Sequence, residues 1–190
     1  TLRGTDPNGA ALTYSVTTSP GNGTLTGSGA SRTYTPTANF NGSDSFQFAV
    51  YNGSVFSANA TVSITVTAVN DVPTARADTY TVAEDAALTI AAATGVLAND
   101  SDVDGDTLTV AVVTAPTNGT VALSTNGSFT YRPAANFVGT DGFRYRASDG
   151  RGGTAEANAT ITVTGTDDPP VAVNDNYVVA EDAVLTVLAG

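Results

Sequence analysis

The 190-residue sequence predicts an all-β protein made of tandem antiparallel β-sandwich domains with an immunoglobulin-like Greek-key topology. Apolar residues alternate with Thr, Ser or other polar residues in short runs, which is the period of a half-buried strand. Asn-Gly pairs separate several of these runs and favour tight turns, because both residues tolerate positive φ. The same ordered set of motifs occurs twice, so the predicted domain is repeated.

Six runs carry the alternation most clearly, and no window between them keeps a helical period, because Gly, Thr and Asn are too frequent. The pattern predicts six or seven short strands in each repeat. The alternating runs span residues 12–16, 46–50, 62–66, 108–112, 143–147 and 159–163. The Asn-Gly pairs stand at residues 22–23, 41–42, 118–119 and 126–127.

Internal repetition divides the chain into domains. Residues 78–90 return as 175–187, and residues 34–46 return as 131–143, in both cases 97 residues further on. Acidic segments that contain proline mark the two junctions, where Pro stiffens the backbone and the acids concentrate charge. We therefore predict a first repeat without its opening strands, a complete second repeat and the opening strands of a third. The predicted bounds are residues 1–70, 71–167 and 168–190.

The chain begins and ends at nearly the same phase of this repeat. Residue 1 aligns near residue 97, and residue 190 aligns near residue 93. The tail of one molecule is therefore able to complete the head of another by strand addition, which predicts head-to-tail self-association. A frayed half-domain at each end is the alternative.

The composition excludes most enzyme classes. The chain has no Cys, His, Met or Trp, and all 7 basic residues are Arg. Without His, Cys or Lys there is no imidazole base, no Cys-His or Ser-His nucleophile pair, no Schiff base and no His/Cys zinc site. What remains is carboxylate chemistry, oxygen-ligand metals and binding. We expect a protein that is not an enzyme.

The net charge of −11 argues against nucleic acid and anionic membrane surfaces as partners, because both bind clustered cations. No apolar run approaches the length of a membrane span, so we expect no membrane insertion. Without disulfides, an extracellular location requires another way of stabilising the fold. Divalent cations are the natural partners of so acidic a chain, and calcium fits this role.

The densest acidic segment is the loop at residues 97–106. Asp100, Asp102, Asp104 and Asp106 alternate there with small or apolar residues, and Gly105 permits a sharp turn. Carboxylates at alternate positions suit a hard cation such as Ca²⁺. The spacing also matches the first half of an EF-hand loop, but the twelfth position is Ala111 rather than Glu. A solvated acidic turn is the alternative to a metal site.

The order of these motifs resembles cadherin-like repeats. The resemblance rests on residues 80–85, on Asp102-Val103-Asp104-Gly105, on Ala147-Ser148-Asp149-Gly150 and on residues 159–163 followed by an acidic linker. It is closest to the bacterial cadherin-like and VCBS-type tandem repeats of very large secreted, RTX-type adhesins. The resemblance implies sandwich domains with calcium at the joints, acting as an extender in a secreted or cell-surface bacterial protein.

The same resemblance assigns metal ligands to two joints. At the joint before the second repeat it implies Asn70, Asp71, Asp102, Asp104 and Asp149, beside Asp100 and Asp106 of the acidic loop. At the joint after it, Glu84, Asp85, Asp167 and Asp168 are the candidates. The acidic loop of the first repeat, residues 4–10, keeps fewer carboxylates, so calcium affinity there is expected to be weaker. Asp44 and Asp141 are the candidates to replace a mid-domain acidic motif that has no clear match.

These observations predict a non-enzymatic, calcium-rigidified extender of an adhesin or biofilm protein. Its expected partners are neighbouring repeats of the same protein, a second copy by homophilic or head-to-tail contact, and polysaccharide. The alternative is a carbohydrate-binding module. The candidates for sugar-stacking platforms are Phe40, Phe46, Phe137 and Phe143, but their place beside Gly-x-Asp turns and in period-two runs favours core packing. Glu84-Asp85 is not a glycosidase pair, because adjacent strand residues point to opposite faces.

Overall fold

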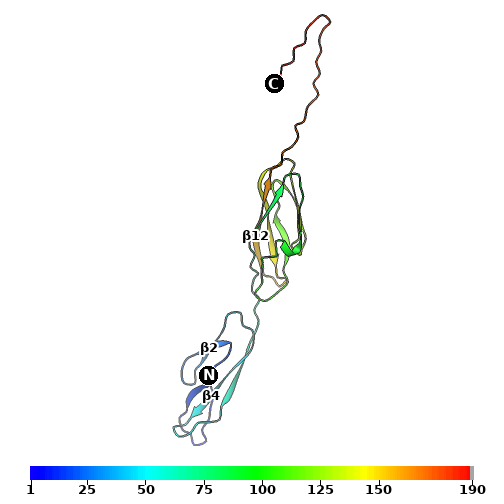
Figure 1. The fold of residues 1–190 in the computed structure, drawn as a ribbon. Coiled ribbons are helices and arrows are strands. Elements are labelled where there is room, and N and C mark those ends of the chain that lie inside the picture. The colour runs from blue at the N-terminus through cyan, green and yellow to red at the C-terminus, as the bar shows by residue number, and fades with distance from the viewer. Residues whose placement is uncertain (189–190) are drawn as a thin grey trace.

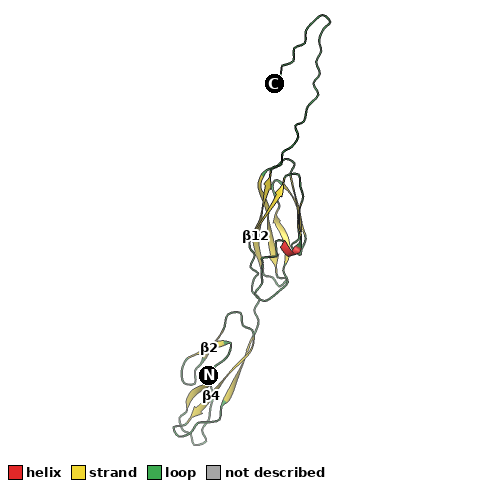
Figure 2. Ribbon diagram, viewed as in Figure 1, coloured by secondary structure: helices red, strands yellow, loops and turns green. Residues whose placement is uncertain are grey.

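The computed structural model describes residues 1–188 as two β domains arranged end to end, followed by an extended tail (Figure 1). The first domain contains β1 (Thr13–Thr18), β2 (Gly23–Thr26), β3 (Thr33–Pro36), β4 (Gly42–Tyr51) and β5 (Ala60–Val66). The second contains β6 (Asp78–Ala83), β7 (Leu88–Ile90), the short 3-10 helix η1 (Ala92–Thr94), β8 (Thr109–Thr114), β9 (Gly119–Leu123), β10 (Phe129–Pro133), β11 (Gly139–Ser148) and β12 (Thr154–Thr164). The prediction of tandem all-β sandwiches is confirmed (Figure 2). Within residues 1–188 no helix is long and apolar enough to cross a bilayer.

The second domain packs a four-stranded sheet, in the order β6-β12-β11-β8, against a three-stranded sheet, in the order β7-β10-β9. The long antiparallel pair of β11 and β12 runs from Gly139 opposite Val163 to Ser148 opposite Thr154. β6 pairs with β12 in parallel, which differs from a purely antiparallel sandwich. After β6 the chain crosses to the other sheet, where β7 pairs with β10. Residues 78–90 thus supply an edge strand to each of the two sheets.

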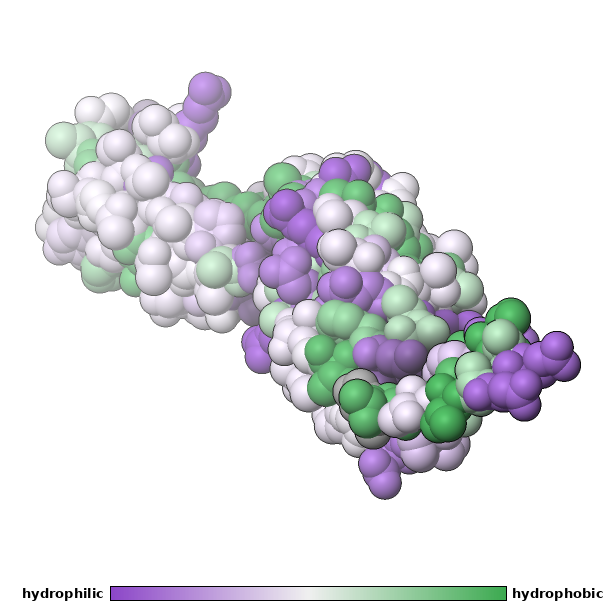
Figure 3. Space-filling view, turned by 90° about the horizontal axis from the view of Figure 1, so that it is seen from above, coloured by the Kyte–Doolittle hydropathy of each residue, from purple (hydrophilic) through white to green (hydrophobic). Residues whose placement is uncertain are grey.

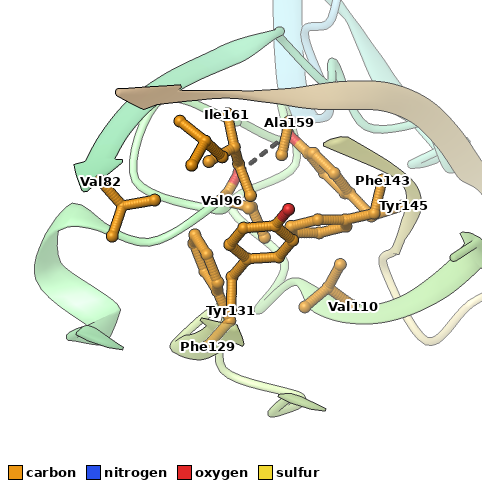
Figure 4. Close-up of a cluster of buried hydrophobic side chains, with 10 residues drawn as sticks. Val82, Val96, Val110, Phe129, Tyr131, Phe143, Tyr145, Ala159 and Ile161 are labelled. Carbon is orange, nitrogen blue, oxygen red and sulfur yellow. Dashed lines mark hydrogen bonds between the residues drawn. The ribbon is translucent and has the colours of Figure 1, made fainter. Parts of the chain in front are cut away.

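Alternate strand residues from the two sheets meet in the core of this domain (Figure 4). Phe129 and Phe143 make an edge-to-face contact, with ring centroids 5.3 Å apart and an interplanar angle of 72°. Phe46 of the first domain and Phe143 are buried, and Phe137 packs against the core, so these rings fill the interior and are not sugar platforms. The fully buried side chains are Tyr131, Tyr145, Ile161, Val96 and Val163.

Asp141 and its counterpart Asp44 fix a loop in each domain. Asp141 accepts hydrogen bonds from the backbone N–H of Thr117 (3.0 Å) and Asn118 (2.9 Å) and from the hydroxyl of Tyr131 (2.7 Å). Burial raises the pKa of Asp141, but these donors outweigh it, and the pKa lies below its usual value. The structure thus gives both carboxylates a local role in their turns, and their replacement of the mid-domain acidic motif stays a prediction.

The first domain is less completely covered. Its sheets are β1-β4-β5 and β2-β3, and within residues 1–188 no strand pairs with the outer edges of β5 and β3. Only Leu2, Phe46 and Phe48 form its buried cluster, against a cluster of Val82 and nine other residues in the second domain. The first domain has five strands around its core and the second has seven, so fewer side chains of the first domain are buried.

Residues 167–188 form no strand, although the repeat predicts opening strands of a third domain here. A strand needs a partner for its backbone groups, and nothing lies beside this tail. One turn is formed, in which the Ala183 N–H donates to the Ala180 carbonyl (3.3 Å). Residues 189 and 190, the last of the predicted opening segment, lie outside the described residues.

Candidate metal centre at the joint between the domains

The linker between β5 and β6 is tied directly to the acidic loop of the second domain. Thr74 and Ser101 form an isolated antiparallel bridge, with backbone hydrogen bonds of 2.7 Å and 3.1 Å. The Asp71 N–H donates to Asp104 Oδ2 at 2.7 Å. These contacts bring linker and loop together, as the sequence predicted for Asn70 and Asp71, at the pole of the second domain that faces the first.

Asp102, Asp104 and Asp106 gather in this loop, and each offers a carboxylate oxygen within 4.8 Å of the others. Asp102 Oδ1 accepts hydrogen bonds from the N–H groups of Asp104 (2.9 Å) and Asp106 (3.3 Å), which folds the loop back on itself. Gly105 adopts φ 77°, where a side chain would be strained. Three carboxylates this close repel one another unless a cation neutralises them.

Two oxygens of this loop mark where such a cation fits. Asp102 Oδ2 and Asp106 Oδ2 are buried and have no hydrogen-bond partner. The other oxygen of Asp106 is 3.0 Å from the Arg151 guanidinium. A buried carboxylate oxygen without a donor is costly, and a hard cation is the kind of ligand that satisfies it.

Asp149 lies beside this cluster and is held in place from several sides. It is only 6% exposed, and it accepts hydrogen bonds from Asn70 Nδ2 (2.7 Å) and from the N–H groups of Arg151 (2.7 Å) and Gly153 (2.9 Å). The bond from Asn70 lowers the pKa of Asp149, burial opposes it, and the backbone donors lower it further. A Cβ on Gly153 would stand 2.2 Å from Asp149 Oδ2, so a larger residue there would displace this carboxylate.

Asp100 is placed differently from the other acids of the loop. Its carboxylate accepts hydrogen bonds from the Arg76 N–H (2.8 Å) and the Tyr145 hydroxyl (3.3 Å). The same hydroxyl also lies 3.0 Å from Asp78 Oδ2. Burial, and then the charge of Asp100, raise the pKa of Asp78 to about 6. The structure therefore puts Asp100 in a network at the edge of the core, apart from the triad of Asp102, Asp104 and Asp106.

The first domain provides an internal comparison for the joint. Asp6 makes the same turn as Asp102, accepting hydrogen bonds from the N–H groups of Asn8 (2.8 Å) and Ala10 (3.2 Å). Its second oxygen accepts a hydrogen bond from Asn52 Nδ2 at 2.9 Å, and Asn52 stands where the second domain has Asp149. An amide thus satisfies in the first domain the oxygen that stays unpartnered in the second.

A second acidic group occupies the far pole of the second domain. Glu84, Asp85 and Asp168 each offer an oxygen within 4.8 Å of the others. Glu84 is 7% exposed, and its Oε1 accepts a hydrogen bond from the Thr166 N–H at 2.6 Å. Asp167 is exposed and does not belong to this group among the described residues. The structure thus brings together three of the four acids predicted for this joint.

Sequence reasoning missed the groups that position the acids. Arg151 forms an ion pair with Asp106, and the Thr74–Ser101 bridge holds the linker against the acidic loop. No recognisable sequence motif marks either contact. The one available signal was that Arg151 closely follows the Asp149-Gly150 motif. Tyr145 was expected as a core residue, and its hydroxyl becomes the centre of the Asp78–Asp100 network.

Comparison with known families identifies the domains. Residues 70–165 match the family model of the bacterial cadherin-like domain. The chain belongs to the bacterial cadherin-like domain family. In this cadherin-like chain, residues 1–65 match a different model, that of a bacterial Ig domain. The two domains thus match different family models, and the cadherin-like assignment of the first repeat stays a prediction of the internal repeat. Domains of both kinds are typical of extracellular proteins.

Two solved protocadherin structures support the same fold. Human mucin-like protocadherin EC1-2 is 20% identical, with a TM-score of 0.55, over 84% of this chain and 86% of that one. Protocadherin Gamma B2 extracellular cadherin domains 1-5 are 17% identical, with the same TM-score of 0.55, over 86% of this chain and 35% of that one. An endo-fucoidan hydrolase from glycoside hydrolase family 107 is 24% identical with a TM-score of 0.39, and the match covers 84% of this chain but only 24% of the hydrolase. No curated protein matches the cadherin-like chain.

Proposed function

We propose that this chain is a calcium-binding extender segment of a secreted or cell-surface bacterial protein, in which Ca²⁺ at the joint holds two domains in line. The observation that carries the proposal is the pair of buried, unpartnered oxygens on Asp102 and Asp106. Asp104 completes a triad with them, and the linker lies against that triad. The oxygen-only donor set suits Ca²⁺.

The residues of the joint have separate tasks in this proposal. Asp102, Asp104 and Asp106 are the carboxylate ligands from the loop, and Asp71 and Asn70 are the oxygen donors from the linker. Bound Ca²⁺ supplies the positive charge that lets these oxygens approach one another. Asp149 holds the Asn70 amide nitrogen, which leaves the amide oxygen of Asn70 as its ligand atom. Ligands on both linker and loop restrict the swing of the first domain.

Titration calorimetry with Ca²⁺ tests this site. We expect Asp102→Asn and Asp104→Asn to remove one calcium or to weaken its binding at least tenfold, because affinity follows ligand charge. Asp6→Asn is the matched control, since it alters the same turn in the first domain, where Asn52 replaces the second acid. If both loop variants bind calcium as the unaltered chain does, the assignment is wrong.

Solution scattering tests the mechanical consequence. With calcium the maximum dimension is expected to match an extended two-domain rod, and with a chelator the distribution of distances should broaden toward bent forms. Asp104→Asn should behave in calcium as the unaltered chain behaves in chelator. Identical profiles in all three samples would leave the fold intact and remove the rigidifying mechanism.

The wider role is part of the same proposal. Membership of the bacterial cadherin-like family and the adjoining bacterial Ig domain support an adhesin or biofilm stalk with no enzymatic activity of its own. Neighbouring repeats of the same protein are its expected partners. Polysaccharide binding stays a prediction. Of the four rings first considered for it, Phe46 and Phe143 are buried in the domain cores, Phe137 packs against a core, and Phe40 is half-buried.

A further inference from the structure

The Asn-Gly pairs of this chain differ in what the backbone around each glycine contacts. Asn-Gly is the sequence in which the backbone nitrogen of the second residue reaches the preceding side-chain amide most easily, because glycine has no Cβ to obstruct the approach. Such pairs stand at residues 8–9, 22–23, 41–42, 52–53, 118–119 and 126–127. The structure determines which of them is able to react.

In five of these pairs the folded backbone restrains the glycine. The N–H groups of Gly9 and Gly127 each donate a 3.0 Å hydrogen bond to a carbonyl of their own turn. Gly23, Gly42 and Gly119 begin β2, β4 and β9, where pairing with the neighbouring strand fixes the backbone. An attack by any of these nitrogens first requires local opening of a turn or a strand end.

The pair of Asn52 and Gly53 lies in the turn that follows β4, and it is arranged differently. Gly53 is exposed with φ 96°, and within residues 1–188 its N–H has no hydrogen-bond acceptor. Asn52 Oδ1 accepts hydrogen bonds from the N–H groups of Ser54 and Val55, both at 3.0 Å. These bonds fold the amide back over the Gly53 peptide. They also stabilise negative charge on the amide oxygen, which an attack on the amide carbon creates.

The second domain shows the equivalent turn with a linker beside it. There the Gly150 N–H donates to Ser148 Oγ at 3.3 Å, while the linker contacts the neighbouring residue, where Asn70 donates to Asp149. Tyr51 stands where the second domain has Ser148, so this local acceptor is missing in the first domain. The free glycine N–H therefore follows from Tyr51, and a connecting segment placed as in the second domain leaves it free.

We propose that Asn52 is a site of spontaneous deamidation. The Gly53 nitrogen forms a bond to Asn52 Cγ and loses its proton to water. The Cγ–Nδ2 bond then breaks, Nδ2 takes up a proton from water and leaves as ammonia, and a succinimide ring remains. Water opens this ring at either carbonyl and gives an aspartate or an isoaspartate. The sequence of steps consumes one water and involves no oxidation.

Deamidation removes the hydrogen bond that holds the acidic loop of the first domain. Asn52 Nδ2 donates to Asp6 Oδ2 at 2.9 Å, and this bond is the main cause that lowers the pKa of Asp6. A carboxylate in place of the amide has no proton to donate and repels Asp6. The product has an acid where the second domain has Asp149, so the two loops become alike in charge.

The new charge is large for this domain. In residues 1–66 the acids Asp6 and Asp44 balance the bases Arg3 and Arg32. Figure 3 shows the first domain as the more distant one, with mostly weakly polar residues on its visible face. One added carboxylate therefore makes a neutral domain acidic.

Peptide mapping by mass spectrometry tests the proposal on the intact chain, incubated at neutral and mildly alkaline pH with a chelator. Asn52 should convert roughly fivefold faster than Asn126, since the hydrogen bond of Gly127 must break before Asn126 reacts. In urea the two rates should become equal. Gly53→Ala should slow conversion at Asn52 and leave Asn126 unchanged. A Cβ at Gly53 meets nothing within 4 Å, so this change is confined to the turn.

The variant Asn52→Asp tests the effect on the loop. It should elute later from an anion exchanger and unfold at a lower temperature than the unaltered chain. Asn126→Asp is the matched control: the Asn126 side chain only accepts, from Ser128, so this variant should shift elution but keep its melting temperature. Equal conversion of Asn52 and Asn126 in the folded chain, or an unchanged rate in Gly53→Ala, would overturn the proposed site. Equal melting temperatures of the unaltered chain and Asn52→Asp would overturn its effect on the loop.

Discussion

Single side chains decide which of two similar loops has the character of a metal site. Asp6 and Asp102 make the same turn, but Asn52 donates to the free oxygen of Asp6, whereas Asp102 Oδ2 stays buried without a donor. The corresponding residue, Asp149, is an acid and accepts from Asn70 instead. The loop that contains Asp6 therefore needs no cation, because Asn52 donates to it, whereas the loop that contains Asp102 faces the acid Asp149 and lacks that donor. The smaller number of acids in residues 4–10 predicted weaker calcium binding by that loop. The hydrogen bond between Asn52 and Asp6 could be seen only in the structure.

Asp78 is expected to make the protein less stable as the pH rises from about 4 to 6. Its pKa in the folded chain is about 6, above the ordinary 3.8, so over this range the folded state holds a proton that the unfolded state has released. The unfolding free energy therefore falls as pH rises through that window. Asp78→Asn should remove this part of the slope. Urea unfolding at several pH values, in dilute chelator-containing solution, measures it, and equal slopes in both chains would contradict it.

At the scale of elements, period and repeat predicted most of what the structure shows. The alternating runs lie in or overlap β1, β4, β5, β8, β11 and β12, because each strand buries one face. The parallel pairing of β6 was not predictable from period two, which is the same for both directions. Alternation along the sequence also does not specify which distant residues an acid contacts. It therefore could not show that Asp100 contacts Tyr145 while Asp102, Asp104 and Asp106 form a triad.

The loops before β9 and before β2 are predicted to depend on their Tyr–Asp contacts. Tyr131→Phe removes a hydrogen-bond donor from the half-buried Asp141, at a tyrosine that is itself fully buried, and should lower the unfolding free energy by about 1–3 kcal/mol. Tyr34→Phe, at the more exposed equivalent in the first domain, should cost less. Thermal unfolding of both variants compares them, and an equal loss in the two would show that burial of the pair does not set its contribution.

At the scale of the whole molecule, the second domain carries one acidic group at each pole. Asp102, Asp104 and Asp106 lie at the pole that the linker reaches, where the Asp71 N–H donates to Asp104. Glu84, Asp85 and Asp168 lie at the far pole, where Glu84 accepts the Thr166 N–H just after β12. Both groups therefore lie where the domain continues into a connecting segment.

Calcium is expected to stabilise the second domain, because a cation that binds only the folded loop adds its binding free energy to the unfolding free energy. At a free calcium concentration of about 100 times Kd this gain is about 2.7 kcal/mol. Asp104→Asn should lose most of it, whereas Asp6→Asn in the first domain should keep it, since Asn52 already satisfies Asp6. Thermal unfolding of the three chains with calcium and with a chelator measures the gain. An equal calcium response in Asp104→Asn and the unaltered chain would separate stability from the acidic triad.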